Sequence, residues 1–144
     1  MESDQTVTPQ IRDKQFEDWL GALFRLYNLA PTLNVINEGE QIDFTFWINS
    51  LFVVGEARWP KEPVDTKQIR DFFGELLERP AFVVGLIIAM GGFTEPGVNY
   101  VRKRSGERTV LWLTRENLQD QILRAEPELP EWLDTTLRER LEHP

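Results

Sequence analysis

The sequence contains no cysteine and one histidine, His143, among its 144 residues. Disulfides and thiolate metal sites are therefore excluded, which fits a protein of the reducing cytoplasm. A lone histidine also argues against histidine-rich zinc sites and Ser-His-Asp triads. Any catalysis must then depend on carboxylates, lysine, arginine, tyrosine or hydroxyl groups.

Long apolar runs and a secretory leader are also missing. The longest apolar run, AFVVGLIIAMGG, falls well short of the ~20 residues that span a bilayer, and we interpret it as a buried strand. The opening MESDQTVTPQ is polar and acidic, unlike a secretory signal. We therefore expect a cytoplasmic protein with no membrane partner.

Positive charge is scarce, because the net charge is −8 at pH 7. This balance argues against strong non-specific binding to nucleic acid. Much of the acidic excess lies in the segment from Arg115 to the end of the sequence. A local basic face therefore remains possible in the preceding part of the chain. Its candidate members are Arg58, Lys61, Lys67, Arg70, Arg102, Lys103 and Arg104.

Hydrophobic periodicity predicts an α/β domain with a central mixed sheet flanked by helices, in the order α-β-β-β-α-β-α-β-α. The first expected element is a helix that begins at about residue 8 and cannot extend past Pro31. Three strands follow, LNVIN, IDFTFWI and LFVVGEA, and then a helix capped at Asp65 or Thr66. The last elements are the strand FVVGLIIA, a short helix that ends near VRKR, the strand ERTVLWLT, and a helix capped at Thr114.

We place this domain at residues 1–125, with residues 1–8 as a frayed terminus. Residues 126–144 form an expected acidic helical extension or linker, because leucines recur at every fourth position from Leu129 to Leu141. This last helix packs on the domain, makes a dimer contact, or leads to a further domain.

Three acidic residues stand at positions that would let them act together: Glu17 on the first helix, Asp43 in the second strand and Glu56 near the end of the third. Two turn-type residues at 49–50 separate the second and third strands, which predicts a hairpin. In that hairpin Asp43 and Glu56 are cross-strand neighbours to within one residue. Two adjacent carboxylates repel each other unless a cation joins them, and Mg²⁺ takes such ligands.

Each acid also fits a purely structural role. Glu17 fits a solvated helix residue, and Asp43 fits a bond to the preceding turn. Glu56 fits an exposed ion pair with Arg58, which would contribute under about 1 kcal/mol.

Asp43 and, thirteen residues later, Glu56-Ala57-Arg58 form a motif that resembles the PD-(D/E)xK nuclease pattern. The flanking segments resemble the Mrr-like restriction endonuclease domain of that superfamily in the same order, from about Ile11 to Leu123. They are FEDWLGALFRLYN for its first helix, GEQIDF for its G-x-x-[IL]-D element, VVGEARW for its acid-bearing strand, IRDFFGEL for the next helix, and GLIIAMGGFTEPGVNYV for its strand, turn and helix.

The resemblance implies a restriction-endonuclease-like fold and hydrolysis of DNA phosphodiester bonds that depends on Mg²⁺ or Mn²⁺, in restriction or phage defence. It also implies that Asp43, Glu56 and the backbone carbonyl of Ala57 bind the metal. Glu17 would support the site from the first helix, and Gln68 would face it from the next helix. A homodimer or a larger defence protein with further domains would select the DNA site.

Arg58 is the departure from the family, which usually has lysine at this position. Arginine keeps the charge and binds phosphate bidentately, but it does not act as a base. Lys61 or Lys67 could replace the missing lysine, although both also fit solvated surface residues. These three basic residues are the candidate DNA contacts.

Three functions stay open at this point. They are an active endonuclease, a catalytically degenerate nuclease-fold module for DNA binding, sensing or protein assembly, and a small interaction domain with a chance match. Trp59, beside the motif, is the candidate for base stacking, whereas the other tryptophans, Trp19, Trp47, Trp112 and Trp132, fit a core or an interface better.

Overall fold

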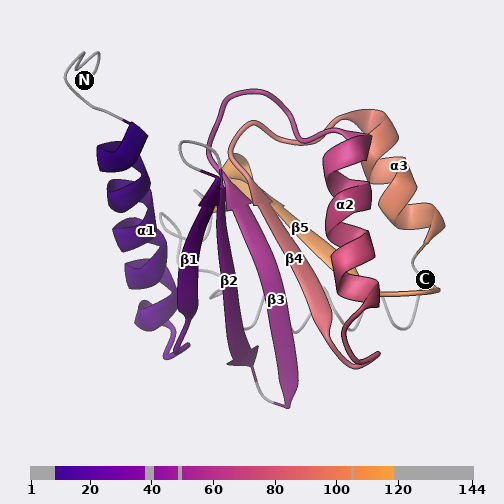
Figure 1. The fold of residues 1–144 in the computed structure, drawn as a ribbon, viewed down its shortest axis with the longest axis horizontal. Coiled ribbons are helices and arrows are strands. Elements are labelled where there is room, and N and C mark those ends of the chain that lie inside the picture. Colours follow the sequence, from indigo (N-terminus) through magenta and orange to yellow (C-terminus); the bar gives the residue numbers. More distant parts are fainter. Residues whose placement is uncertain (1–8, 38–40, 49, 105, 119–144) are drawn as a thin grey trace.

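The computed structural model describes residues 9–37, 41–48, 50–104 and 106–118. Its elements are α1 (Pro9–Leu26), β1 (Thr32–Asn37), β2 (Gln41–Ile48), β3 (Leu51–Arg58), α2 (Thr66–Leu77), β4 (Val84–Ala89), α3 (Glu95–Lys103) and β5 (Val110–Thr114) (Figure 1). This order confirms the predicted one, and residues 115–118 begin the helix expected after Thr114. Among the described residues, no helix combines the length and apolar character needed to cross a membrane. The frayed terminus expected at 1–8, the extension expected at 126–144 and Trp132 lie outside the described residues.

A five-stranded mixed sheet in the order β1-β2-β3-β4-β5 forms the centre of the fold. Strand β2 is antiparallel to both β1 and β3, whereas β4 is parallel to both β3 and β5. The predicted hairpin is confirmed, with Ile48 of β2 paired to Leu51 of β3 across the turn. Strand β4 has a neighbour on each side and is buried along its whole length, as its continuous apolar sequence predicts.

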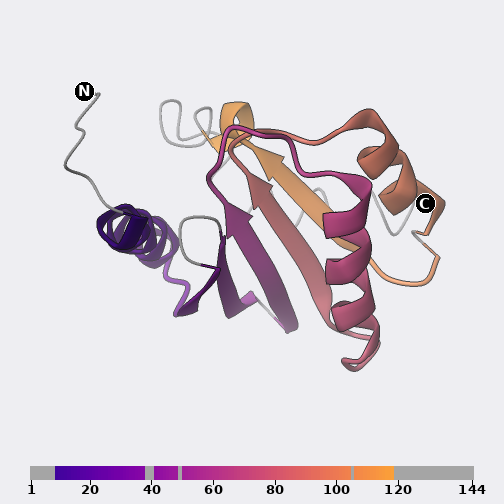
Figure 2. The same cartoon turned by 45° about the horizontal axis from the view of Figure 1, so that its top comes forward.

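Two hydrophobic cores lie on opposite faces of the sheet, because successive residues of a strand point to opposite sides. In the first core, the rings of Phe44 and Phe46 lie 5.0 and 4.9 Å from the ring of Phe24 on α1. Ile87 of β4 belongs to the second core, which α2 and α3 cover. Figures 1 and 2 show α2 and α3 together on one side of the sheet, with α1 across from them.

The end of α1 is set by an asparagine rather than by the following proline. The helix ends at Leu26, well before Pro31, and Asn28 has a φ of 62°. Asparagine tolerates this left-handed conformation, which commonly terminates helices. The backbone N–H of Leu29 then donates to the carbonyl of Phe24 at 3.0 Å. The chain therefore turns back towards the sheet before the proline is reached.

Side-chain caps begin the other two helices. Of the two candidates for α2, Asp65 is the cap and Thr66 is the first helical residue. Asp65 accepts from the N–H of Gln68 at 3.0 Å, and the Gln68 side chain accepts from the N–H of Asp65 at 2.9 Å. This reciprocal pair is a capping box. Thr94 caps α3 by accepting from the N–H of Gly97 at 3.1 Å.

The loops that follow β3 and β4 are held together at one edge of the sheet. The N–H of Val64 donates to the carbonyl of Gly92 at 2.9 Å, and the N–H of Thr94 donates to the carbonyl of Val64 at 3.0 Å. Position 91 requires glycine, because a Cβ on Gly91 would lie 2.5 Å from the carbonyl oxygen of Glu62. The loop after β3 is thus fixed by backbone contacts.

Candidate active site

Two carboxylates lie directly opposite each other on neighbouring strands. The register of β2 and β3 pairs Asp43 with Glu56 and Gln41 with Arg58. Paired residues of an antiparallel sheet project to the same face, so these four side chains share one face. It is the face that α2 covers, since Val54, two residues before Glu56, packs in the second core. The predicted register is confirmed.

Each carboxylate is held by a neighbour on its own strand. Arg58 Nε donates to Glu56 Oε2 at 2.6 Å, and Gln41 Nε2 donates to Asp43 Oδ1 at 2.6 Å. The ion pair is largely buried, with 15% of the Arg58 side chain and 5% of the Glu56 side chain exposed. The alternative prediction, an exposed ion pair between Glu56 and Arg58 on the protein surface, is therefore wrong.

Burial changes the acidity of Glu56. Withdrawal from water raises the pKa of Glu56 from 4.5 to about 7, because a buried carboxylate loses its hydration. Contact with Arg58 lowers this pKa, whereas the charges of Asp43 and Glu75 raise it. A cation beside these acids would favour their ionised forms.

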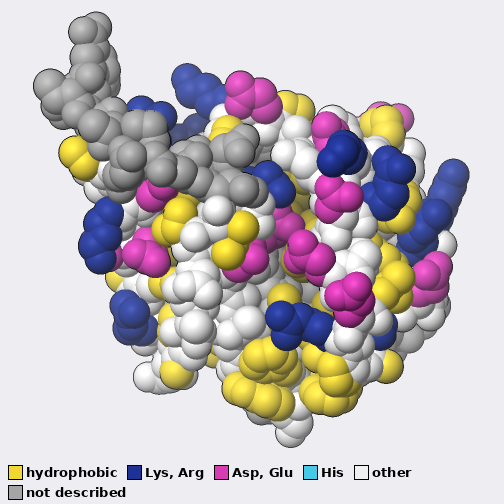
Figure 3. Space-filling view, in the orientation of Figure 1, with side chains coloured by type: hydrophobic (Ala, Val, Ile, Leu, Met, Phe, Trp, Pro, Cys, Tyr) yellow, Lys and Arg dark blue, Asp and Glu magenta, His cyan; other side chains and the backbone are white. Residues whose placement is uncertain are grey.

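Glu75 of α2 is a third acid on this face, and the motif does not predict it. It lines a groove of about 490 Å³ together with Asp43 of β2 and with Glu78 and Arg79, which directly follow α2. Burial and the charge of Asp43 raise the pKa of Glu75. Figure 3 shows acidic side chains gathered over the middle of this face, between the strands and α2. Glu75 follows Gln68 by seven residues, which is about two helical turns. This spacing is the sequence signal that places Glu75 on the same face of α2 as Gln68.

The paired carboxylates suit a hard divalent cation. Asp43 and Glu56 provide two carboxylates on one face, the ligands that Mg²⁺ prefers. Ala57 is paired with Ile42 of β2 and Ile88 of β4, and a carbonyl in a sheet bond still has a second lone pair. No group of three or more acidic or histidine side chains within the described ranges converges to hold a metal. The donor set that fits is two carboxylates completed by a carbonyl and water.

A comparison with protein-family models shows to which family the chain belongs. The Mrr_cat model, described as a restriction endonuclease, matches residues 9–122. The chain belongs to the Mrr_cat restriction endonuclease family. The match spans every element from α1 to β5, so the restriction-endonuclease-like fold is confirmed. Comparisons with curated proteins and with solved structures gave no match.

In this Mrr_cat domain, Arg58 occupies the position where the motif predicts lysine, and the two alternative lysines lie elsewhere. Lys67 Nζ contacts Asp71 Oδ2 at 3.1 Å, and both side chains are mostly exposed. Lys61 lines a hollow with Trp59, on the α1 side of the sheet. Arg58 is a cation that contacts Glu56 of the carboxylate pair.

Gln68 lies on the helix that covers the carboxylate pair of the Mrr_cat domain, whereas Glu17 lies on the helix that covers the other face of the sheet. Gln68 completes the capping box of α2 and shares a helix face with Glu75. Glu17 lines a separate hollow on the α1 side. The charges that act on Glu56 are those of Arg58, Asp43 and Glu75. The structure therefore does not bring Glu17 to the pair.

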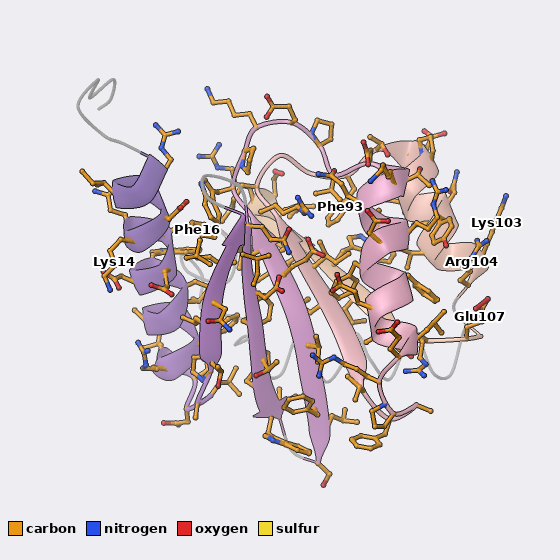
Figure 4. The ribbon with its side chains drawn as sticks, viewed as in Figure 1. Lys14, Phe16, Phe93, Lys103, Arg104 and Glu107 are labelled. Carbon is orange, nitrogen blue, oxygen red and sulfur yellow. The ribbon has the colours of Figure 1, made fainter. Side chains whose placement is uncertain are left out.

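Of the remaining basic candidates of the Mrr_cat domain, Arg102, Lys103 and Arg104 lie at the end of α3, whereas Arg70 is exposed on α2. The guanidinium carbon of Arg104 lies 3.9 Å from the ring centre of Tyr100. Figure 4 shows Lys103 and Arg104 at the outer end of α3, away from β2 and β3. The basic residues are thus divided between several parts of the described surface and do not form one face with Arg58.

Proposed function

We propose that this chain is a Mg²⁺-dependent DNA endonuclease domain that hydrolyses phosphodiester bonds in restriction or phage defence. The observation that supports it is the direct pairing of Asp43 with Glu56 on one face of the sheet, in a chain of a restriction endonuclease family. A second copy of the chain or a further domain would select the DNA site.

The charges of the site are the reason for including a cation in the proposal. Asp43, Glu56 and Glu75 carry three negative charges when ionised, against the one positive charge of Arg58. Such a face repels a phosphate unless a cation offsets it. Mg²⁺ held by Asp43, Glu56 and the Ala57 carbonyl would activate a bound water and offset charge on the phosphate.

The side chains of the chain itself then have distinct roles. Arg58 uses Nε to hold Glu56, and the terminal nitrogens of its guanidinium remain as donors to a phosphate oxygen. Arg58 stabilises charge and does not take a proton from water. Lys61 and Lys67 are exposed after β3 and would contact flanking phosphates, while Gln68 supplies a polar group on the same side as Glu75.

The second candidate function is a catalytically degenerate nuclease-fold module for DNA binding, sensing or assembly. One observation favours it: the largely buried Arg58 side chain already forms an ion pair with Glu56 at 2.6 Å. A cation internal to the protein can thereby replace the metal. Under this alternative Asp43 and Glu56 would bind Mg²⁺ weakly or not at all.

Cleavage of supercoiled plasmid with Mg²⁺ or Mn²⁺ tests the proposal. The wild-type chain should produce nicked and linear DNA. Loss of a group outside the metal's ligand shell typically reduces activity by about 10- to 100-fold. Asp43→Asn removes a proposed metal ligand, so it should slow cleavage by more than this. Asp18→Asn is the matched control, because Asp18 is exposed on α1 and paired with Lys14. Cleavage that persists in Asp43→Asn would place the active site elsewhere.

Arg58→Lys separates the two functions. If the wild-type chain cleaves DNA, Arg58→Lys should change the cleavage rate only modestly, because lysine retains the positive charge. If the wild-type chain does not cleave DNA and the Arg58→Lys variant does, the result would support the degenerate module. Calorimetric titration with Mg²⁺ adds a second readout, since the endonuclease requires binding that Asp43→Asn removes.

A further inference from the structure

An aromatic hollow lies where the three parallel strands end. Trp59, Met90 and Arg115 directly follow β3, β4 and β5. They line a hollow of about 440 Å³ with Phe16, Trp19, Lys61 and Leu118. In sheets with parallel strands, ligands bind beyond the carboxyl ends of those strands. The position of this aromatic hollow therefore suits a ligand.

Aromatic rings form one wall of the aromatic hollow. The ring of Phe16 lies 5.5 Å from that of Trp19 and 4.8 Å from that of Trp59, centre to centre. Phe16 points from α1 towards the sheet, whereas Lys14 points away from it (Figure 4). Trp19 is 36% exposed, so a planar group has access to its ring.

One polar group of a residue that lines the hollow has no partner in the part of the chain that the structure describes. The indole N–H of Trp59 is buried and has no hydrogen-bond acceptor among the described residues. Buried indole N–H groups normally donate to an acceptor. Because Trp59 lines the hollow, a ligand whose acceptor reached this N–H would satisfy it.

The charge of the aromatic hollow is opposite to that of the chain. Among the described residues that line it, the two charged ones, Lys61 and Arg115, are both basic, although the whole sequence carries a net charge of −8. The groove beside Asp43, in contrast, is lined by three acids and one arginine. A ligand that combines a flat ring with an anion therefore matches the aromatic hollow better than it matches the acidic groove.

The hollow adjoins the candidate active site along the chain. Successive strand residues point to opposite faces, so Arg58 turns to the carboxylate side and Trp59 to the α1 side. The loop that carries Lys61 is fixed through Val64, whose N–H and carbonyl both bond to the loop after β4. The hollow and the carboxylate pair thus flank the same end of β3.

We propose that the aromatic hollow binds an unpaired nucleotide, with the base against Trp19 and Trp59 and the phosphate at Lys61 and Arg115. A paired base is enclosed by its neighbours in the duplex and cannot offer its face to a side chain. The same chemistry is present in a nucleotide of a DNA strand and in a free mononucleotide. The proposal rests on the proposed function, since that function makes DNA the substrate.

Binding of a fluorescein-labelled oligothymidylate of about ten nucleotides, a length typical of single-strand sites, tests this without metal. Anisotropy is measured in EDTA for the full chain, Trp19→Ala and Trp59→Phe. Trp19→Ala should weaken binding at least about fivefold, since stacking on one aromatic side chain contributes that much or more. Trp59→Phe keeps a stacking ring but removes the indole N–H, so it should weaken binding about two- to tenfold, the typical effect of losing one hydrogen bond. The control is Trp47→Ala, because Trp47 is 58% exposed and pairs with Phe52 outside the hollow. Unchanged affinity in both hollow variants would overturn the proposal.

Two further ligands identify what the hollow recognises. An oligonucleotide of equal length without bases keeps the phosphates and should bind several-fold more weakly; equal affinity would refute base recognition. Displacement of the oligothymidylate by thymidine monophosphate would assign the site to the nucleotide alone. Binding that only the strand supports, and that the tryptophan changes weaken, would assign it to a nucleotide within DNA.

The failure of this proposal is distinguishable from that of the proposed function. Asp43→Asn should abolish cleavage and leave binding of the oligothymidylate in EDTA unchanged. Tryptophan-dependent binding without any cleavage would refute the endonuclease and retain the hollow. Cleavage that depends on Asp43, with binding indifferent to Trp19 and Trp59, would refute the hollow alone.

Discussion

Replacing Glu56 with glutamine is expected to change how the stability of the metal-free protein depends on pH. Burial raises the pKa of Glu56 to about 7 in the folded protein, whereas the hydrated carboxyl of the unfolded chain ionises near 4.5. Between these values the folded state keeps a proton that the unfolded state has released. The corresponding stability is therefore fully present below pH 4.5 and is lost as the pH rises through about 7.

The size of the effect follows from the two pKa values of Glu56. One pKa unit corresponds to about 1.36 kcal/mol, so the rise from 4.5 to about 7 corresponds to about 3 kcal/mol. Only 5% of the side chain is exposed, so solvent screening reduces this little. Glutamine does not titrate. The free energy of unfolding of Glu56→Gln, relative to wild type, should therefore increase by about 3 kcal/mol between pH 4 and pH 8.

Urea denaturation in EDTA at each pH unit from 4 to 8 measures this difference. Glu62→Gln, which removes an exposed carboxylate in the following loop, controls for the loss of one negative charge. A difference between Glu56→Gln and wild type that stays constant over this range would refute the reasoning. It would mean that the ion pair with Arg58 outweighs burial and keeps Glu56 ionised throughout.

Three further predictions follow from the same contacts. Mg²⁺ should bind more weakly at pH 6 than at pH 8 in calorimetric titrations, since it competes with the proton on Glu56; equal affinities would argue against Glu56 as a ligand. Arg108→Ala should lower the free energy of unfolding in urea by about 2 kcal/mol, because its guanidinium donates four hydrogen bonds of 2.9–3.4 Å to carbonyls at the end of α2, and Arg108→Lys should recover only part. Gly55→Ala should cost about 1–3 kcal/mol in thermal melting, because a Cβ would lie 2.5 Å from the Leu86 carbonyl oxygen and also overlap Phe44; unchanged melting would contradict this packing.

Local sequence signals were sufficient for most of the fold. Helical and alternating periodicity predicted the order of the elements, and the two-residue turn at 49–50 set the register of the hairpin. Because register follows from turn length, Asp43 opposite Glu56 was predictable before any tertiary contact was known. The family motif relies on the same short-range spacing.

Features of the site that depend on which helix covers which face were not predictable in this way. The motif placed Glu17 with the pair, but α1 packs on the other face of the sheet. It gave no sign of Glu75, which approaches Asp43 only because α2 lies over this face. Such contacts join elements that are distant in the sequence, and they depend on which face of the sheet each helix covers.

The sequence alone determined the elements, their order and the acids that pair, because these depend on local spacing. Tertiary structure decided that Glu56 and Arg58 are a buried pair, since burial requires α2 and the neighbouring strands. It also decided that Trp59 faces away from Arg58 and meets Phe16 of α1. Covering the two faces of one sheet with different helices separates adjacent residues into two different environments.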